Sequence, residues 1–126
     1  MAWILRRRRR VRRVSSKSRI EFQLLKEQAR TRVTERLEHF NEHYRFKYNK
    51  VFIRNTRSRW GSCSSKHNLG FNYRVAKISP ELLDYIVVHE LCHIKEFNHS
   101  QDFWSLVAQT IPNWKHLRKT LRSRTL

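Results

Sequence analysis

The sequence predicts an α+β domain that is rich in helix and carries a short β-hairpin packed beside one buried helix. Three observations favour this class. Glycine and proline are scarce, with only two of each in 126 residues, whereas turn-dense β folds need many more. Apolar residues recur at helical spacing over residues 20–44 and over a second segment that begins near Ser79. Two short stretches with the character of strands, residues 50–55 and 69–75, lie between these segments.

The formal charge of +18 is unevenly distributed along the chain. Residues 1–19 contain nine of the 28 Lys and Arg residues and no acid. Like charges repel and little apolar surface is available there, so we expect residues 1–19 to form a disordered tail and residues 20–126 one folded domain. Such a tail could bind nucleic acid or another polyanion by releasing counterions. The candidate contacts are Arg6, Arg7, Arg8, Arg9, Arg10, Arg12 and Arg13.

The cellular setting is constrained by two further features of the sequence. No apolar run of about 18 residues occurs, so no membrane-spanning helix is expected. Cys63 and Cys92 are too few for a disulfide framework, which favours a cytoplasmic protein in which both are packed thiols.

The first predicted helix covers residues 20–44. Its apolar stripe consists of Leu25, Ala29, Val33, Leu37, Phe40 and Tyr44, with charged residues on the opposite face. The stretches 50–55 and 69–75 follow as the two strands of a hairpin with a long polar connection.

The second half of the chain predicts three helices. Ser79 is a good N-cap and Pro80 suits a first helical position, so a helix is expected from Pro80 to about Phe97. Asn98 could close it in the left-handed conformation. Ser100 could then cap a helix over residues 101–110, and a last, basic helix follows Pro112.

The stretch "VVHELCHIKEFNHS" contains the pattern H-E-x-x-H at residues 89–93. In a strand, residues four apart lie about 13 Å from each other, too far to bind one ion. In a helix they lie about 6 Å apart, so His89 and His93 could both reach one zinc ion. The capped start at Ser79 favours the helix.

Glu90 projects about 100° away from His89 on this helix. It could therefore act as the general base on a water molecule without binding the metal. The alternative is a surface glutamate, but an acid in a helix that is apolar nearly all round needs a partner. A catalytic zinc also needs a third protein ligand. His99 lies just past the expected helix end and is the preferred candidate, with Glu96 as its rival.

The segment His39–His43 fits the inverted pattern H-x-x-E-H. These histidines lie off the apolar stripe of their helix and have no obvious third ligand, so we expect them to face solvent. His67 and His116 are expected at the surface for similar reasons.

The segments "RNTRSRWGSCSSKHNLGFNYR", "PELLDYIVVHELCHIKEFNHSQDFWSLV" and "IPNWKHLRK" resemble the YgjP-like metallopeptidase family. The resemblance covers about Glu27 to Leu121 and leaves out the tail. It implies a zincin-like fold related to the SprT and WLM proteases. It also implies one zinc ion per chain on His89, His93 and His99, with Glu90 as the catalytic base. Family members usually have an additional β-rich N-terminal region, so substrate contacts made by that region would be absent here.

The loop between the two expected strands holds Arg57, Arg59 and Trp60. A strand beside the metal helix could pair with an extended substrate. We therefore expect this loop to form a wall of the cleft, with Arg57 or Arg59 stabilising negative charge on the reacting group. The alternative is that Trp60 closes a structural turn and both arginines are solvated.

The leading functional hypothesis is a zinc-dependent hydrolase, most readily a peptidase acting on a peptide or protein. The same centre could instead cleave a nucleotide phosphoanhydride, although the sequence contains no Gly-rich phosphate loop. A third hypothesis is a nucleic-acid-binding module with a structural zinc. Glu90 argues against it, because a structural site would fill its fourth position with a protein ligand.

Overall fold

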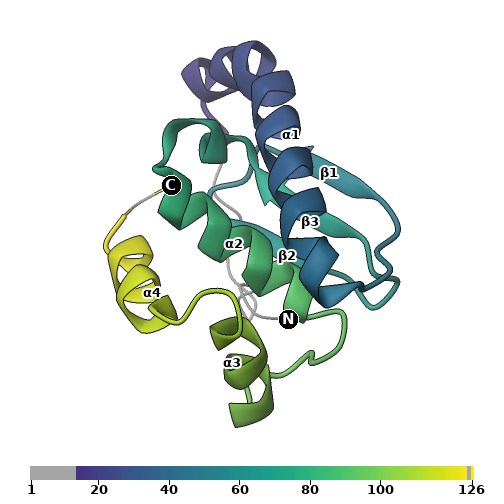
Figure 1. Cartoon of the computed structure of the whole chain (residues 1–126). Coiled ribbons are helices and arrows are strands. Elements are labelled where there is room, and N and C mark those ends of the chain that lie inside the picture. Colours follow the sequence, from purple (N-terminus) through teal and green to yellow (C-terminus); the bar gives the residue numbers. More distant parts are fainter. Residues whose placement is uncertain (1–13, 125) are drawn as a thin grey trace.

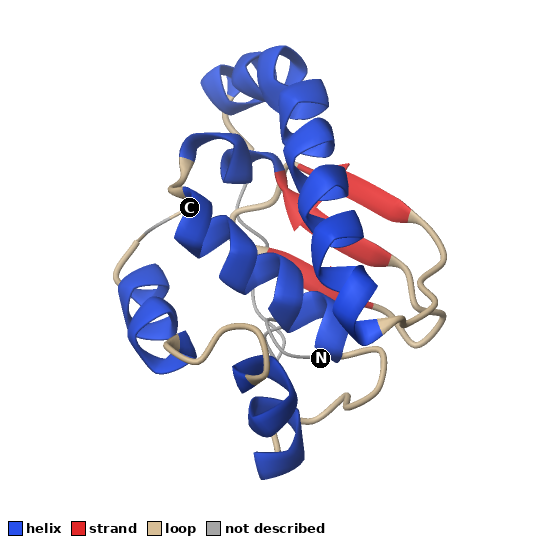
Figure 2. Cartoon of the chain, in the orientation of Figure 1, coloured by secondary structure: helices blue, strands red, loops and turns tan. Residues whose placement is uncertain are grey.

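A computed structural model describes residues 14–124 and 126 of the chain. Within this part, α1 (Ser16–Tyr44) and α2 (Pro80–Cys92) lie side by side across one face of a three-stranded sheet. The shorter helices α3 (Gln101–Ala108) and α4 (Trp114–Arg122) pack against α2. Figure 2 shows that helices outweigh strands in this arrangement. The predicted α+β class is therefore confirmed.

Helix α1 forms because its apolar side chains make one stripe. Ala29, Val33 and Leu37 are fully buried, and the stripe continues through Phe40 and Tyr44. The helix begins four residues earlier than predicted, because the Ser15 side chain accepts a hydrogen bond from the Ser18 amide and caps it. Residues 16–19 therefore belong to the helix rather than to the tail, and Ser18 is buried.

The sheet consists of β1 (Val51–Arg54), β2 (Gly61–Cys63) and β3 (Leu69–Asn72) in the order β1-β3-β2. A hairpin does lie beside α2, but its strands are β2 and β3, which pair antiparallel with Gly61 opposite Phe71. The expectation that residues 50–55 and 69–75 pair as a hairpin is wrong. These two segments run parallel, with Val51 opposite Leu69, because the chain forms the third strand within the loop that connects them.

Residues after β3 also differ from expectation. The second strand ends at Asn72 rather than Val75, and a 3₁₀ helix, η1 (Tyr73–Lys77), follows it. The Asn72 side chain accepts a hydrogen bond from the Arg74 amide, which caps this helix. The η1 helix leads from β3 to the start of α2 and packs against α1 on the way (Figure 1).

The later helices agree with the predictions more closely at their starts than at their ends. Ser79 caps α2 through the Leu82 amide, and Ser100 caps α3 through the Phe103 amide. Helix α2 ends at Cys92, not at Phe97. Asn98 does not close it in the left-handed conformation, since Arg45 and His67 are the non-glycine residues with positive φ in the described chain. None of the helices described in residues 14–124 is long and apolar enough to cross a membrane.

Candidate metal centre

His89 and His93 lie one turn apart at the end of α2. Both are 1% exposed, and Glu90 between them is fully buried. The helix starts where its serine cap and proline put it, so residues four apart share a face, as the sequence predicts. The i,i+4 spacing places the two imidazole rings 4.8 Å apart, centroid to centroid.

The chain turns sharply after His93, and this turn delivers the third histidine. Nδ1 of His93 lies 2.8 Å from the carbonyl oxygen of Glu96. The amides of Ile94 and Lys95 each bond to a carbonyl three residues earlier, in tight 3₁₀-type turns. These contacts end the helix five residues before the predicted position and direct the chain back, so that His99 reaches the other two histidines. Glu96 contributes its backbone carbonyl to the site through His93.

The three Nε2 atoms form an almost equilateral triangle. Each pair, His89–His93, His93–His99 and His99–His89, is separated by 3.1 Å. Neutral imidazoles at this spacing cannot satisfy all three contacts by hydrogen bonding, because each ring nitrogen is either a donor or an acceptor. Three Nε2 atoms at this spacing form an arrangement that could hold a cation between them.

The protonation of the histidines is compatible with metal binding. Burial lowers the pKa of His93 to about 4. Burial also lowers the pKa of His89 well below its usual value. In His93 the Nδ1–H donates to the Glu96 carbonyl, which leaves the lone pair on Nε2. Both rings are therefore neutral near pH 7 and have the form that binds metals.

The spacing of the nitrogens suits a divalent ion of the size of zinc. Zinc binds imidazole nitrogens at about 2.0–2.1 Å, and tetrahedral geometry then separates neighbouring nitrogens by about 3.3 Å. The observed separations of 3.1 Å are close to that value. His89, His93 and His99 are also the group of three potential ligands found together in the described residues. The residues present thus fit a metal ion with three protein ligands.

An aromatic wall surrounds the histidines. Phe103 is fully buried and stacks on His93, with ring centroids 4.3 Å apart and planes 19° from parallel. Trp104 lies 5.3 Å from His99 and stacks on Trp114 at 4.0 Å. Phe103 is thus a core residue, and Trp104 also borders the metal centre. The half-buried Arg118 lies over Trp104 at 5.4 Å, a contact that the sequence did not predict.

Strand β2 lies next to the buried carboxylate of Glu90. Gly61 approaches so closely that an added Cβ would lie 2.8 Å from Glu90 Oε2. Sequence reasoning did not assign Gly61 to the site, because a glycine in a polar loop indicates only a turn. Cys63, on the same strand, is buried, and so is Cys92 on α2. Burial raises the pKa of each thiol to about 12, in agreement with their predicted role as packed residues.

The loop between β1 and β2 holds the three residues that were expected to line the cleft. Trp60 is buried at 7% exposure and directly precedes Gly61. Arg57 and Arg59 are half-buried. The backbone carbonyl of Arg59 accepts a hydrogen bond from the Asn72 side chain, which attaches the loop to β3. The loop therefore reaches the site through Gly61, while the roles of Trp60 and the two arginines stay predictions.

The remaining histidines lie where the sequence predicts or close to it. His39 and His43 are exposed, and His43 contacts the side chain of Gln109. His116 is exposed, and the half-buried His67 stacks on Phe97. The seven candidate arginines between residues 6 and 13 lie outside the described residues.

Comparison with known proteins gives consistent matches. A family model described as YgjP-like, metallopeptidase domain, matches residues 2–124, and so includes most of the tail that the resemblance left out. The zymogen of the metallopeptidase abylysin from Pyrococcus abyssi is 27% identical, with a TM-score of 0.65 over 71% of this chain and 90% of that one. The jannalysin zymogen from Methanocaldococcus jannaschii shares the fold at 24% identity, with a TM-score of 0.57 over 74% and 92%. No curated protein matches the chain.

Proposed function

Since the chain belongs to the YgjP-like metallopeptidase family, we propose that it is a zinc-dependent peptidase in which Glu90 is the general base. Family membership makes it a metal-dependent hydrolase of peptides or proteins; the choice of zinc and the role of Glu90 are the proposal. The observation that carries it is the triangle of Nε2 atoms, each pair 3.1 Å apart. These atoms come from His89, His93 and His99, and a zinc ion held there would supply Lewis acidity and lower the pKa of a water molecule to about 7.

Glu90 is suited to move a proton beside this centre. It follows His89 directly on α2, and it is fully buried against the backbone of Gly61. A carboxylate held in a dry site can accept the proton of the attacking water and deliver it to the leaving amine. Because its side chain is packed on a strand, Glu90 has little freedom to turn away from that task.

Strand β2 could hold the substrate. It is an edge strand, since β3 is its pairing partner within the described part of the chain. An extended peptide could add to its open edge through main-chain hydrogen bonds, next to Glu90. Arg57 and Arg59, in the preceding loop, would then lie on the side from which the peptide enters, where either could stabilise developing negative charge.

The first test measures zinc per chain in untagged protein by elemental mass spectrometry. We expect about one zinc per chain in the wild type and a strongly reduced content in His99→Ala. His39→Ala, which removes an exposed histidine of the same type, is the matched control and should keep its zinc.

The second test measures cleavage of an unfolded protein, with Glu90→Gln as the control that keeps the metal ligands. Loss of about 10²-fold or more in kcat with unchanged zinc is expected. Pyrophosphate release from a nucleotide by the wild type, abolished in Glu90→Gln and without any peptide cleavage, would show that the centre acts on phosphoanhydrides instead. Well-folded protein that takes up no zinc would refute the proposed centre itself.

A further inference from the structure

A cavity of about 400 Å³ lies where the start of β2, η1 and the end of α4 meet. Its size is in the range of sites for small ligands or single side chains. The lining residues are Trp60, Arg74, Lys77, Ile78, Ser123 and Arg124. They come from three separate parts of the chain, so only the folded protein forms this cavity.

The lining is strongly cationic. Three of the six residues carry a positive charge and none is acidic. Lys77 pairs with Glu21 at 2.9 Å, which offsets its charge. Neither Arg74 nor Arg124 forms an ion pair with any residue that the structure describes. Within the described residues the cavity therefore keeps an excess of positive charge. Glu21 interacts electrostatically with Arg74 but forms its ion pair with Lys77.

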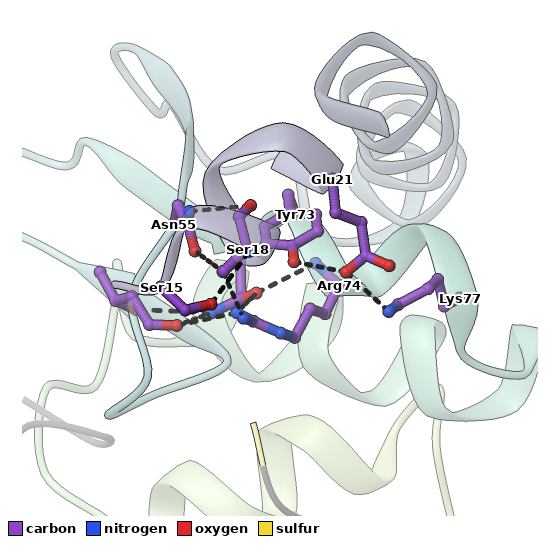
Figure 3. A network of polar contacts seen from close by, with 9 residues as sticks. Ser15, Ser18, Glu21, Asn55, Tyr73, Arg74 and Lys77 are labelled. Carbon is purple, nitrogen blue, oxygen red and sulfur yellow. Dashed lines mark hydrogen bonds and ion pairs between the residues drawn. The ribbon is translucent and has the colours of Figure 1, made fainter. Parts of the chain in front are cut away.

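Arg74 is the central feature, because it is a buried guanidinium with only neutral acceptors. Its residue exposure is 9%. Nη1 donates to the Thr56 carbonyl at 3.1 Å and to Asn72 Oδ1 at 3.3 Å, while Nη2 donates to Ser18 Oγ at 2.8 Å (Figure 3). A guanidinium has five N–H donors. The Nε–H and one Nη2–H therefore remain available, and a buried cation with free donors is costly unless an anion pairs with it.

The surrounding contacts hold Arg74 in one position. Ser18 is itself bonded to Asn55 Oδ1 at 3.0 Å, and the guanidinium lies 4.6 Å from the ring of Tyr73 (Figure 3). Arginine in a fixed orientation binds carboxylates and similar oxyanions well, because its planar group offers parallel donors and loses little entropy on binding. The guanidinium of Arg124 adds further donors to the lining, whereas the hydroxyl of Ser123 donates to the Thr120 carbonyl at 2.7 Å.

We propose that this cavity binds a carboxylate of the peptide substrate, either an acidic side chain or the C-terminal carboxylate. The inference rests on the proposed peptidase function. The link between the two sites is Trp60, which lines the cavity and directly precedes Gly61, the residue packed on Glu90. A peptide extended along β2 would thus pass from the metal centre toward the cavity. A small cavity suits one compact anionic group, whereas a nucleic acid backbone needs a row of cations.

Anion binding can be measured without turnover. Acetate and sulfate are titrated separately into the zinc-loaded full chain while the Nε–H resonance of Arg74 and the indole N–H of Trp60 are followed by NMR. We expect saturable shifts of both signals. Arg124→Gln should weaken binding about tenfold, because it removes a charged donor. Lys119→Gln removes the same charge from exposed surface of α4 outside the cavity and should leave binding unchanged.

A second variant tests the guanidinium group of Arg74. Arg74→Lys keeps the charge but removes the planar pair of donors, so anion binding should be lost while the far-UV circular dichroism spectrum is retained. Shifts that do not saturate, or equal affinities in the wild type, Arg124→Gln and Arg74→Lys, would overturn the proposal.

The substrate arm uses peptide pairs that differ only in Glu or Gln at one position, or in a free or amidated C-terminus. They are titrated into Glu90→Gln protein, so that no cleavage is needed. For the pair whose variable position reaches the cavity, the peptide with the carboxylate should bind about tenfold more tightly than its neutral partner. This preference should vanish in protein that carries both Glu90→Gln and Arg124→Gln. Acetate binding without any discrimination between the peptides would overturn the assignment to substrate. A wild type that cleaves no peptide would instead refute the peptidase function and leave these binding results to stand on their own.

Discussion

The side chain of Glu90 fills the space that a Cβ atom on residue 61 would need. A Cβ built on Gly61 would lie 2.8 Å from Glu90 Oε2 and 2.9 Å from its Cγ, closer than such contacts allow. Strand β2 and helix α2 can therefore pack at this distance only with glycine at position 61. The proposed base is positioned by the absence of a side chain on the strand opposite.

Gly61→Ala should consequently displace Glu90 while leaving the three histidines in place. We expect kcat for peptide hydrolysis to fall at least about tenfold, since small misplacements of a reacting group are costly. Zinc content should remain near one per chain. Gly70→Ala is the matched control: its Cβ would meet the hydroxyl of Ser62, which can rotate away. Equal losses of kcat in the two variants would show that packing of the sheet, not the position of Glu90, is responsible.

Phe103 should affect metal affinity through its stacking on His93. Replacing it by leucine keeps an apolar residue but removes the ring that lies 4.3 Å from the imidazole. We expect zinc affinity, measured by competition with a chelator, to fall about tenfold, as for other residues that orient ligands. Val107→Ala removes buried volume one turn later on the same helix. That control should lower the free energy of unfolding without changing zinc affinity, and a similar fall in affinity for both variants would contradict the orienting role.

Removal of the metal should destabilise the fold. The three Nε2 atoms lie 3.1 Å apart, with His89 and His93 buried and His99 exposed. An ion bound there only in the folded state stabilises that state by mass action. Excess chelator should therefore lower the Tm of the wild type by about 10 °C in thermal denaturation followed by circular dichroism. The Tm of His99→Ala should respond little. An unchanged wild-type Tm after verified loss of zinc would argue that the ion adds nothing to stability.

Acid should weaken the link between α1 and η1. Hydrogen bonds from Lys77, at 2.9 Å, and from Tyr73, at 2.5 Å, lower the pKa of Glu21 below its usual value of 4.5. The stabilisation from Glu21 is thus complete above about pH 4.5 and is lost as the pH falls through the lowered folded-state pKa. Urea unfolding of the wild type and Glu21→Gln should show a difference in stability that shrinks below pH 4.5. A difference that stays constant from pH 7 to pH 3 would contradict this account.

Local signals in the sequence correctly predicted where α2 and α3 start. Ser79 and Ser100 each cap the helix that follows, because a cap depends on atoms within three residues. The ends of helices were harder to predict. Helix α2 stops at Cys92 because the His93 side chain bonds to the Glu96 carbonyl. The types of these residues do not predict that contact. Strand pairing was also mispredicted, since the choice of β3 as the parallel neighbour of β1 depends on residues far apart in the chain.

The chemistry of the metal centre was encoded in the residues and their spacing. Two histidines four apart on a capped helix must share a face, because helical geometry repeats every 3.6 residues. The supporting parts of the site were decided by the tertiary structure. The fit of Gly61 against Glu90, the stacking of Phe103 on His93 and the burial of Arg74 beside an open cavity each join segments that lie far apart in sequence. Such contacts depend on how the whole chain packs, and no short stretch of sequence carries that information.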